Sequence, residues 1–237
     1  VVNDSNCAEC KPDEALLGLK RILPTLLTAQ VEETSPEGQK LIADLGIKSL
    51  PAFVFGKDIE KTDFYAQAAA IFDKVGDQYL LNTAQVGLPV GKYLILPKVT
   101  DNDIKIGLDS AKVKMIVFSD FQCPYCKTLH PTLKQALSEY GDKIQFVFKQ
   151  FPLSFHPQAL PAALASECAN EQNKFLVYAD KLFEKQADWG KTTGVQSFKT
   201  LAVQLGMNAK QFNSCLDGKK YQDKISADLV EGQTFGI

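Results

Sequence analysis

The chain has 237 residues, of which 45% are hydrophobic and 23% are charged, and its formal net charge is −2 at pH 7. This length can form one large domain or two of ordinary size, and the composition is that of a globular rather than a disordered protein. Lysine and arginine are spread along the chain, so we expect no nucleic-acid partner. No apolar run approaches the roughly 20 residues of a membrane-spanning helix.

The chain begins inside an expected element. Val1 and Val2 end an apolar run, and a strand of two residues is short against a usual length of about 5. We therefore expect further residues before Val1, which include the start of this strand and a signal or a membrane anchor.

The first hundred residues alternate predicted strands and helices. The predicted elements are a helix at 12–27, a short strand at 28–31, a helix beginning at 36, a strand at 47–55, a helix at 63–75 and a strand at 93–96. Ser35 and Pro36 predict a helix start, with serine as the N-cap and proline at the first helical position. Gly46 predicts the end of that helix, and Pro24 a bend or late break in the first one.

The rest of the chain begins with a mixed polar segment and ends in helices. The predicted elements are a linker at 97–112, strands at 113–119 and 144–151, a helix at 124–140, and a helical stretch at 157–235. Leu129, Leu133 and Leu137 give the helix at 124–140 its apolar face.

The segment Cys123-Pro124-Tyr125-Cys126 carries the strongest functional signal. Two cysteines at this spacing, on the first turn of a helix that follows a buried strand, indicate a thiol–disulfide oxidoreductase. The helix N-terminus supplies positive potential and free N–H groups, which stabilise a thiolate. We therefore predict that Cys123 is the nucleophile and Cys126 the resolving cysteine. Pro124 fits the first helical position, and Tyr125 lies where it tunes the pair.

A second pair, Cys7 and Cys10, is predicted to open a helix after a strand in the same way. Glu9 lies between these cysteines, and a nearby carboxylate disfavours the thiolate. The pair is therefore a weaker and more reducing couple, an electron relay, or a structural disulfide.

Other residues leave simpler interpretations open. Two CxxC pairs can bind zinc, but they lie more than a hundred residues apart, which favours redox chemistry. Cys168 and Cys215 each fall on the apolar face of a predicted helix, where a buried free thiol is common. His130 and His156 are either proton shuttles or structural residues, and the structural role is favoured.

Three segments carry a resemblance to a known family. Residues 118–127 (FSDFQCPYCK), His130-Pro131, and residues 151–157 (FPLSFHP) resemble DsbA-like proteins, thioredoxin-fold enzymes of the bacterial cell envelope. The resemblance covers about residues 104–237. It implies a thioredoxin fold with a helical insertion, Cys123 as nucleophile and Cys126 as resolving cysteine. It also implies a structural disulfide between Cys168 and Cys215.

The same resemblance implies that the second domain is C-terminally incomplete. In this family a cis-proline loop, two strands and a helix follow the point that residues 234–237 occupy here. Residues 1–96 resemble thioredoxin-like domains more loosely. There Cys7 and Cys10 match the redox pair, and Pro51 matches the cis-proline position.

We therefore expect an α/β protein with tandem thioredoxin-like domains at 1–100 and 101–237. Its expected activity is thiol–disulfide exchange with exported proteins in the periplasm, without a cofactor or metal. Protein thiols or disulfides are the expected substrates, and a redox partner protein recycles Cys123 and Cys126. The direction of exchange (oxidase, isomerase or reductase) stays open. The alternative is a redox-fold chaperone or peptide-binding module without turnover.

Overall fold

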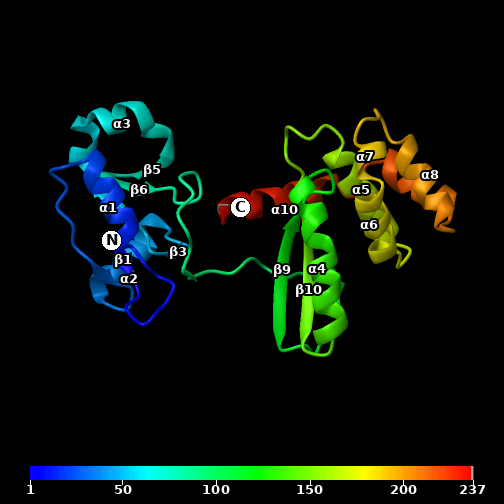
Figure 1. Cartoon of the computed structure of the whole chain (residues 1–237), viewed down its shortest axis with the longest axis horizontal. Coiled ribbons are helices and arrows are strands. Elements are labelled where there is room, and N and C mark those ends of the chain that lie inside the picture. Colours follow the sequence, from blue (N-terminus) through cyan, green and yellow to red (C-terminus); the bar gives the residue numbers. More distant parts are fainter. Residues whose placement is uncertain (236) are drawn as a thin grey trace. The chain divides into compact units, whose positions relative to one another are not determined.

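The computed structural model describes residues 1–235 and 237, which divide into two compact units. Unit 1 contains Val1–Leu96 and unit 2 contains Pro97–Thr234. In Figure 1, unit 1 runs from blue to cyan and unit 2 from green to red. No helix among the described residues is both long and apolar enough to cross a lipid bilayer.

Unit 1 is built from short strands and helices. Its elements are β1 (Val2–Asn3), α1 (Asp13–Ile22), β2 (Val31–Glu32), α2 (Pro36–Leu45), β3 (Ser49–Leu50), β4 (Val54–Gly56), the 3-10 helices η1 (Lys57–Lys61) and η2 (Ala69–Ile71), α3 (Asp63–Ala68), β5 (Phe72–Val75), β6 (Gln78–Leu81) and β7 (Lys92–Tyr93). β1 pairs in parallel with β2, and β3 pairs antiparallel with β7. β6 lies between β4 and β5 in an antiparallel sheet.

Helices cover two sides of these strands. Consecutive residues of an extended segment point to opposite faces, and Ala52 and Phe53 follow this rule. Phe53 packs in one apolar cluster with Leu19 of α1, whereas Ala52 packs in another with Leu45 of α2. The bridge between Val2 and Ala52 joins β1 to this segment.

Two helix predictions in unit 1 have different outcomes. The predicted start and end of α2 are confirmed, since the Ser35 hydroxyl accepts a hydrogen bond from the Gly38 N–H at 3.0 Å and Gly46 has a φ of 62°. The prediction that the first helix reaches residue 27 is wrong, because α1 ends at Ile22. Proline disfavours helical geometry in the residue before it, and Leu23, which precedes Pro24, is not helical.

The predicted helix at 63–75 is too long. α3 ends at Ala68, and Phe72–Val75 instead forms β5, the partner of β6 in a hairpin. The two-residue turn of this hairpin contains Gly76, whose φ is 60°. Glycine adopts a positive φ at no steric cost, which suits the tight turns of hairpins.

Unit 2 has a three-stranded sheet and six more helices after β10. Its elements are β8 (Ile104–Ile106), β9 (Val113–Ser119), α4 (Pro124–Tyr140), β10 (Ile144–Gln150), α5 (Ala159–Asn170), α6 (Phe175–Glu184), α7 (Gln186–Trp189), α8 (Gln196–Gln204), α9 (Ala209–Asp217) and α10 (Gln222–Thr234). β10 is central, parallel to β9 and antiparallel to β8. The predicted bounds of β9 and α4 are confirmed, whereas β8 lies in the segment predicted as a linker.

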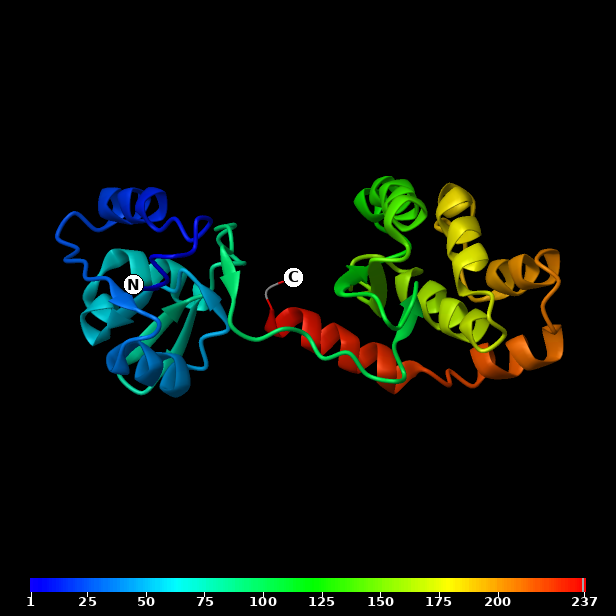
Figure 2. The same cartoon turned by 90° about the horizontal axis from the view of Figure 1, so that it is seen from below.

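The two faces of β10 differ in chemistry. Phe148 belongs to the apolar core that packs against α5 and α6. Lys149 is only 3% exposed and lies within 3.5 Å of carboxylate oxygens of Asp103, Asp228 and Glu231. Two of these acids belong to α10, so buried ion pairs attach α10 to the central strand. Figure 2 shows α4 and α10 on opposite sides of the sheet.

Candidate redox site

Cys123 lies at the N-terminus of α4, directly after β9. It is the N-cap residue, with extended backbone geometry, and Pro124 occupies the first helical position. The Cys123 carbonyl accepts the first helical hydrogen bond, from the Lys127 N–H at 3.1 Å. The first N–H groups of a helix have no intrahelical partner and carry the positive end of its dipole. This potential favours a negative charge on the Cys123 sulfur.

Cys126 lies one turn further along α4. Both cysteines are half-buried free thiols, and Cys126 packs against the apolar core of unit 2. Burial raises the pKa of the Cys126 thiol, and the Ser119 hydroxyl and the Asp120 backbone only partly offset that effect. Tyr125, between the two cysteines, is 84% exposed. The pair therefore combines a cysteine at the helix N-terminus with a second cysteine that stays protonated at neutral pH.

Asp120 fixes the loop that precedes the pair. Its carboxylate is 3% exposed and accepts hydrogen bonds from the backbone N–H groups of Gln122, at 2.6 Å, and Leu153, at 3.0 Å. His156 Nδ1 lies 2.7 Å from the same carboxylate. Asp120 and His156 thus join the redox loop to residues 151–157, the third segment that carries the family resemblance.

Two glutamines that the sequence analysis did not single out also hold this loop. Gln186, at the start of α7, donates from Nε2 to the carbonyl oxygens of Phe121 at 2.8 Å and Cys123 at 3.0 Å. The Gln122 side chain donates to the Gly190 carbonyl at 3.1 Å and accepts from the Gln158 N–H at 2.7 Å. These partners lie 36 to 68 residues away along the chain, so no local pattern identifies them.

His130 lies on α4 but faces α6. Its Nε2 lies 2.6 Å from a carboxylate oxygen of Asp180, and the Lys134 ammonium lies 2.7 Å from the other oxygen. Burial alone would raise the pKa of Asp180, but the hydrogen bonds from Lys134 and His130 outweigh it and lower that pKa. His130 therefore has a structural partner away from the redox loop.

Cys168 of α5 and Cys215 of α9 are joined by a disulfide. Both are buried in the apolar core of unit 2, at 1% and 6% exposure. The bridge links two helices that are 47 residues apart along the chain.

The Cys7–Cys10 pair of unit 1 has a different setting. The two cysteines form a disulfide, and Cys10 is buried at 5% exposure. The expectation that this pair opens a helix is wrong, because α1 begins only at Asp13. Pro12 explains the delay, since proline disfavours helical geometry in the preceding Lys11. Glu9 and Lys11 form an exposed ion pair at 3.8 Å.

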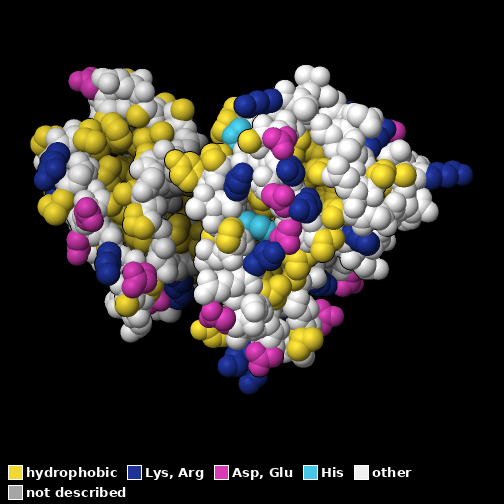
Figure 3. Space-filling view, turned by 45° about the vertical axis from the view of Figure 1, so that its right-hand side comes forward, with side chains coloured by type: hydrophobic (Ala, Val, Ile, Leu, Met, Phe, Trp, Pro, Cys, Tyr) yellow, Lys and Arg dark blue, Asp and Glu magenta, His cyan; other side chains and the backbone are white. Residues whose placement is uncertain are grey.

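Pro51 and the Cys7–Cys10 loop border one cavity of unit 1. The peptide bond between Leu50 and Pro51 is cis. The cavity has a volume of about 690 Å³, and Glu9, Lys11, Pro51, Phe53 and Leu81 are among its lining residues. Figure 3 shows apolar side chains over much of the visible surface of unit 1.

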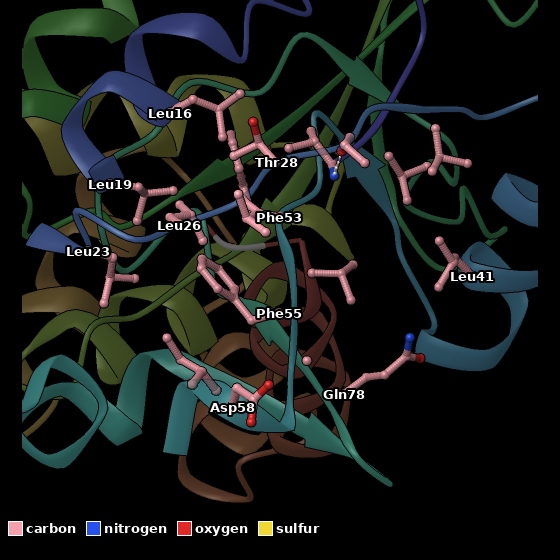
Figure 4. A pocket seen from close by; sticks show the side chains of 18 of the residues that line it. Leu16, Leu19, Leu23, Leu26, Thr28, Leu41, Phe53, Phe55, Asp58 and Gln78 are labelled. Atoms are coloured by element: carbon pink, nitrogen blue, oxygen red, sulfur yellow. Dashed lines mark hydrogen bonds between the residues drawn. The ribbon is translucent and has the colours of Figure 1, made fainter. Parts of the chain in front are cut away.

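A second cavity of unit 1, of about 570 Å³, lies between α1 and β4. Figure 4 shows Leu16, Phe53 and Phe55 pointing into it, and none of the described residues that line it is a cysteine. Across residues 1–235 and 237, no group of three or more histidine, cysteine, aspartate or glutamate side chains is arranged to hold a metal ion.

Residues 99–237 match a protein-family model described as thioredoxin. A variant of alpha-DsbA1 from Wolbachia pipientis is 25% identical, with a TM-score of 0.52 over 59% of this chain and 72% of that one. A putative protein-disulfide oxidoreductase of Rickettsia bellii is 26% identical over 143 residues, which are 58% of this chain and 52% of that protein.

A different kind of relative has higher sequence identity. The Na(+)/H(+) antiporter NhaA 1 of Mycolicibacterium vanbaalenii is 34% identical over 154 residues, which are 63% of this chain. The chain spans only 24% of the length of that antiporter.

Proposed function

Because the chain belongs to the thioredoxin family, we propose that unit 2 is a DsbA-like thiol–disulfide oxidoreductase acting on cysteines of exported proteins. One observation carries this proposal: Cys123 is the N-cap of the 17-residue helix α4, and Cys126 lies one turn later with a raised pKa. This is the arrangement of a nucleophile stabilised as a thiolate and a resolving thiol within reach.

The reaction is a two-electron exchange without a cofactor. A substrate thiolate attacks the Cys123 sulfur of the oxidised pair, the Cys123–Cys126 bond breaks, and Cys126 leaves and takes up a proton. A second substrate thiolate then attacks the substrate sulfur of the mixed disulfide and releases Cys123 as a thiolate. The substrate loses two electrons as its disulfide forms, and the Cys123–Cys126 pair gains them. A redox partner protein removes these electrons and restores the pair.

The helix N-terminus favours this direction of exchange. A positive end of a helix dipole stabilises the Cys123 thiolate, which exists only in the reduced pair. A stabilised reduced form makes the pair a stronger oxidant, as in the most oxidising members of the superfamily. We therefore assign unit 2 the role of a disulfide donor rather than a reductase or isomerase.

We also propose that residues 1–100 and 101–237 are tandem thioredoxin-like domains and that α5 to α9 form the helical insertion of the second. In unit 1, strands flanked by helices on two sides support this assignment, as does cis Pro51 on the same cavity as the Cys7–Cys10 loop. Cys7 and Cys10 are then a second redox pair that passes electrons to or from Cys123 and Cys126. Separate Cys→Ser variants of each pair test the relay, which fails if removal of Cys7 and Cys10 leaves unchanged the rate at which a protein electron donor reduces the oxidised Cys123–Cys126 pair.

The Cys168–Cys215 disulfide supports an oxidising compartment, since buried structural disulfides persist mainly in exported proteins. We assign the protein to the extracytoplasmic space of the bacterial cell envelope.

The test is turnover with a thiol substrate. A reduced two-cysteine peptide is oxidised by the wild-type chain in a glutathione buffer, and insulin reduction is measured in parallel. Cys123→Ser abolishes both activities, and Cys126→Ser accumulates mixed disulfides at Cys123 that mass spectrometry identifies. Absence of turnover with both substrates, together with peptide binding, would instead make the protein a peptide-binding module.

A further inference from the structure

Gln186, at the start of the short helix α7, contacts the redox loop through its side-chain amide. Gln186 donates two hydrogen bonds from one nitrogen, to the carbonyl oxygens on either side of Gln122, those of Phe121 and Cys123. The Cys123 carbonyl also accepts the first backbone bond of α4. The Cys123 carbonyl oxygen is therefore held by Gln186 of α7 as well as by the backbone of α4.

This contact acts on the backbone that sets the direction of the Cys123 side chain. Cys123 has a φ of −73° and a ψ of 126°, the extended geometry of an N-cap residue. The Cys123 side chain makes no capping hydrogen bond in this geometry, so its thiolate is stabilised by the positive potential of the free N–H groups of the first turn rather than by a direct bond. A rotation about the Cys123 backbone would move the sulfur away from those groups and weaken their stabilisation of the thiolate.

We propose that Gln186 is a positioning residue for Cys123, through which the helical insertion of α5 to α9 sets the oxidising power of the Cys123–Cys126 pair. This inference rests on the proposed function of unit 2. The stabilised thiolate exists only in the reduced pair, so loss of the Gln186 hydrogen bonds raises the free energy of the reduced form more than that of the oxidised form. The pair then becomes a weaker oxidant.

The test compares the wild-type chain with two variants of Gln186. Gln186→Leu keeps the approximate size of the side chain and removes the donor. Gln186→Glu keeps the shape and places an acceptor against the two carbonyl oxygens. Each full-length protein is equilibrated in glutathione buffers, thiols are trapped by alkylation, and the redox state of the Cys123–Cys126 peptide is measured by mass spectrometry.

We expect the equilibrium constant for oxidising glutathione to fall about fivefold in Gln186→Leu, the effect of one typical hydrogen bond, and further in Gln186→Glu. Fivefold corresponds to roughly 20 mV for a two-electron couple. The rate at which iodoacetamide alkylates Cys123 at pH 6 falls in the same order, because only the thiolate reacts.

Gln172→Leu is the matched control. Gln172 is also a half-buried glutamine, and it lies between α5 and α6. Its side chain makes two hydrogen bonds with Asn208: it accepts from the backbone N–H and donates to the carbonyl oxygen. It does not touch the redox loop. We expect Gln172→Leu to lower the melting temperature as much as Gln186→Leu does, with no change in the redox equilibrium or in the alkylation rate.

The outcomes separate this inference from the proposed function. An unchanged redox equilibrium in both Gln186 variants, or an equal shift in Gln172→Leu, overturns the positioning role and leaves the proposed function standing. A wild-type chain that turns over neither the peptide nor insulin overturns the proposed function, whereas the Gln186 equilibria still report on the positioning of Cys123.

Discussion

The two cysteine pairs have the same spacing but meet their helices differently. Cys123 is the N-cap of α4, and Pro124 begins the helix at once. Cys10 is followed by two non-helical residues before α1 begins, and that helix has acidic residues, Asp13 and Glu14, in its first turn. The Cys123–Cys126 pair is therefore placed at the positive end of a helix, whereas the Cys7–Cys10 pair lies in a turn with carboxylates nearby.

CxxC spacing therefore does not by itself define a redox couple. The position of the nearby proline decides where each helix can begin, and proline acts in opposite ways in the two units. Pro124 directly follows Cys123 and occupies the first helical position, which it favours. Pro12 follows Lys11 and delays the helix. On this account the Cys123–Cys126 pair is the stronger oxidant.

The largest expected effect comes from removing Cys123, in contrast to removal of the Cys7–Cys10 pair. Cys123→Ser lowers peptide oxidation by at least about a thousandfold, because a hydroxyl at this position cannot form the mixed disulfide. Cys7→Ser combined with Cys10→Ser changes turnover by less than about twofold when glutathione recycles the other pair directly. Steady-state rates of peptide oxidation in one glutathione buffer check both results. Comparable losses of rate in both variants would contradict the conclusion that the two cysteine pairs differ in function.

The disulfides themselves differ in their expected contribution to stability. The Cys168–Cys215 bridge spans 47 residues, and chain entropy predicts that Cys168→Ala with Cys215→Ala lowers the free energy of unfolding by about 4 kcal/mol. Cys7 and Cys10 are only three residues apart, so replacing both with alanine lowers the free energy of unfolding by only about 2 kcal/mol. Denaturant unfolding followed separately in each unit measures both values. Equal losses would mean that loop length does not govern them.

The pH dependence of the resolving step is the next largest effect. Burial holds the pKa of Cys126 above its ordinary value, so below that pKa the reactive thiolate fraction grows about tenfold for each pH unit. Release of a peptide from a mixed disulfide with Cys123 should therefore accelerate from pH 6 to beyond pH 8. Stopped-flow fluorescence of a labelled peptide measures this rate, and a plateau reached below pH 8 would rule out a raised pKa.

The smallest expected effect concerns Glu9. Glu9→Gln removes a carboxylate between Cys7 and Cys10, which makes that pair a few-fold stronger as an oxidant. Because the Glu9 side chain is exposed, high salt should reduce the difference. Lys11→Gln is the matched control and should shift the equilibrium in the opposite direction. Shifts of the same sign would show that charge is not the cause.

Local sequence patterns predicted part of the fold. The bounds of β9 and α4 follow from an apolar run and from Pro124, and those of α2 follow from Ser35 and Gly46. β8 and the β5–β6 hairpin were missed, because strands of three or four residues carry too little periodicity to separate them from loops. The turn at Gly76 is the one signal that could have identified the hairpin.

The candidate site was predictable only where its chemistry is local. The pattern at Cys123–Cys126 identifies the thiols, and burial of Cys126 follows from its place one turn into α4. Gln186 was not predictable, because its role depends on a contact with Cys123 across 63 residues of chain. The pairing of Cys168 with Cys215 likewise came from the family resemblance rather than from spacing.

The most direct test of this account is the reduction potential of both pairs within one protein. Trapping and mass spectrometry after equilibration in glutathione buffers report each pair separately. We predict that Cys123–Cys126 lies nearer the roughly −120 mV of strong disulfide donors and Cys7–Cys10 nearer the roughly −270 mV of thioredoxin-like reductants. A potential for Cys7–Cys10 equal to or less negative than that of Cys123–Cys126 would contradict the account.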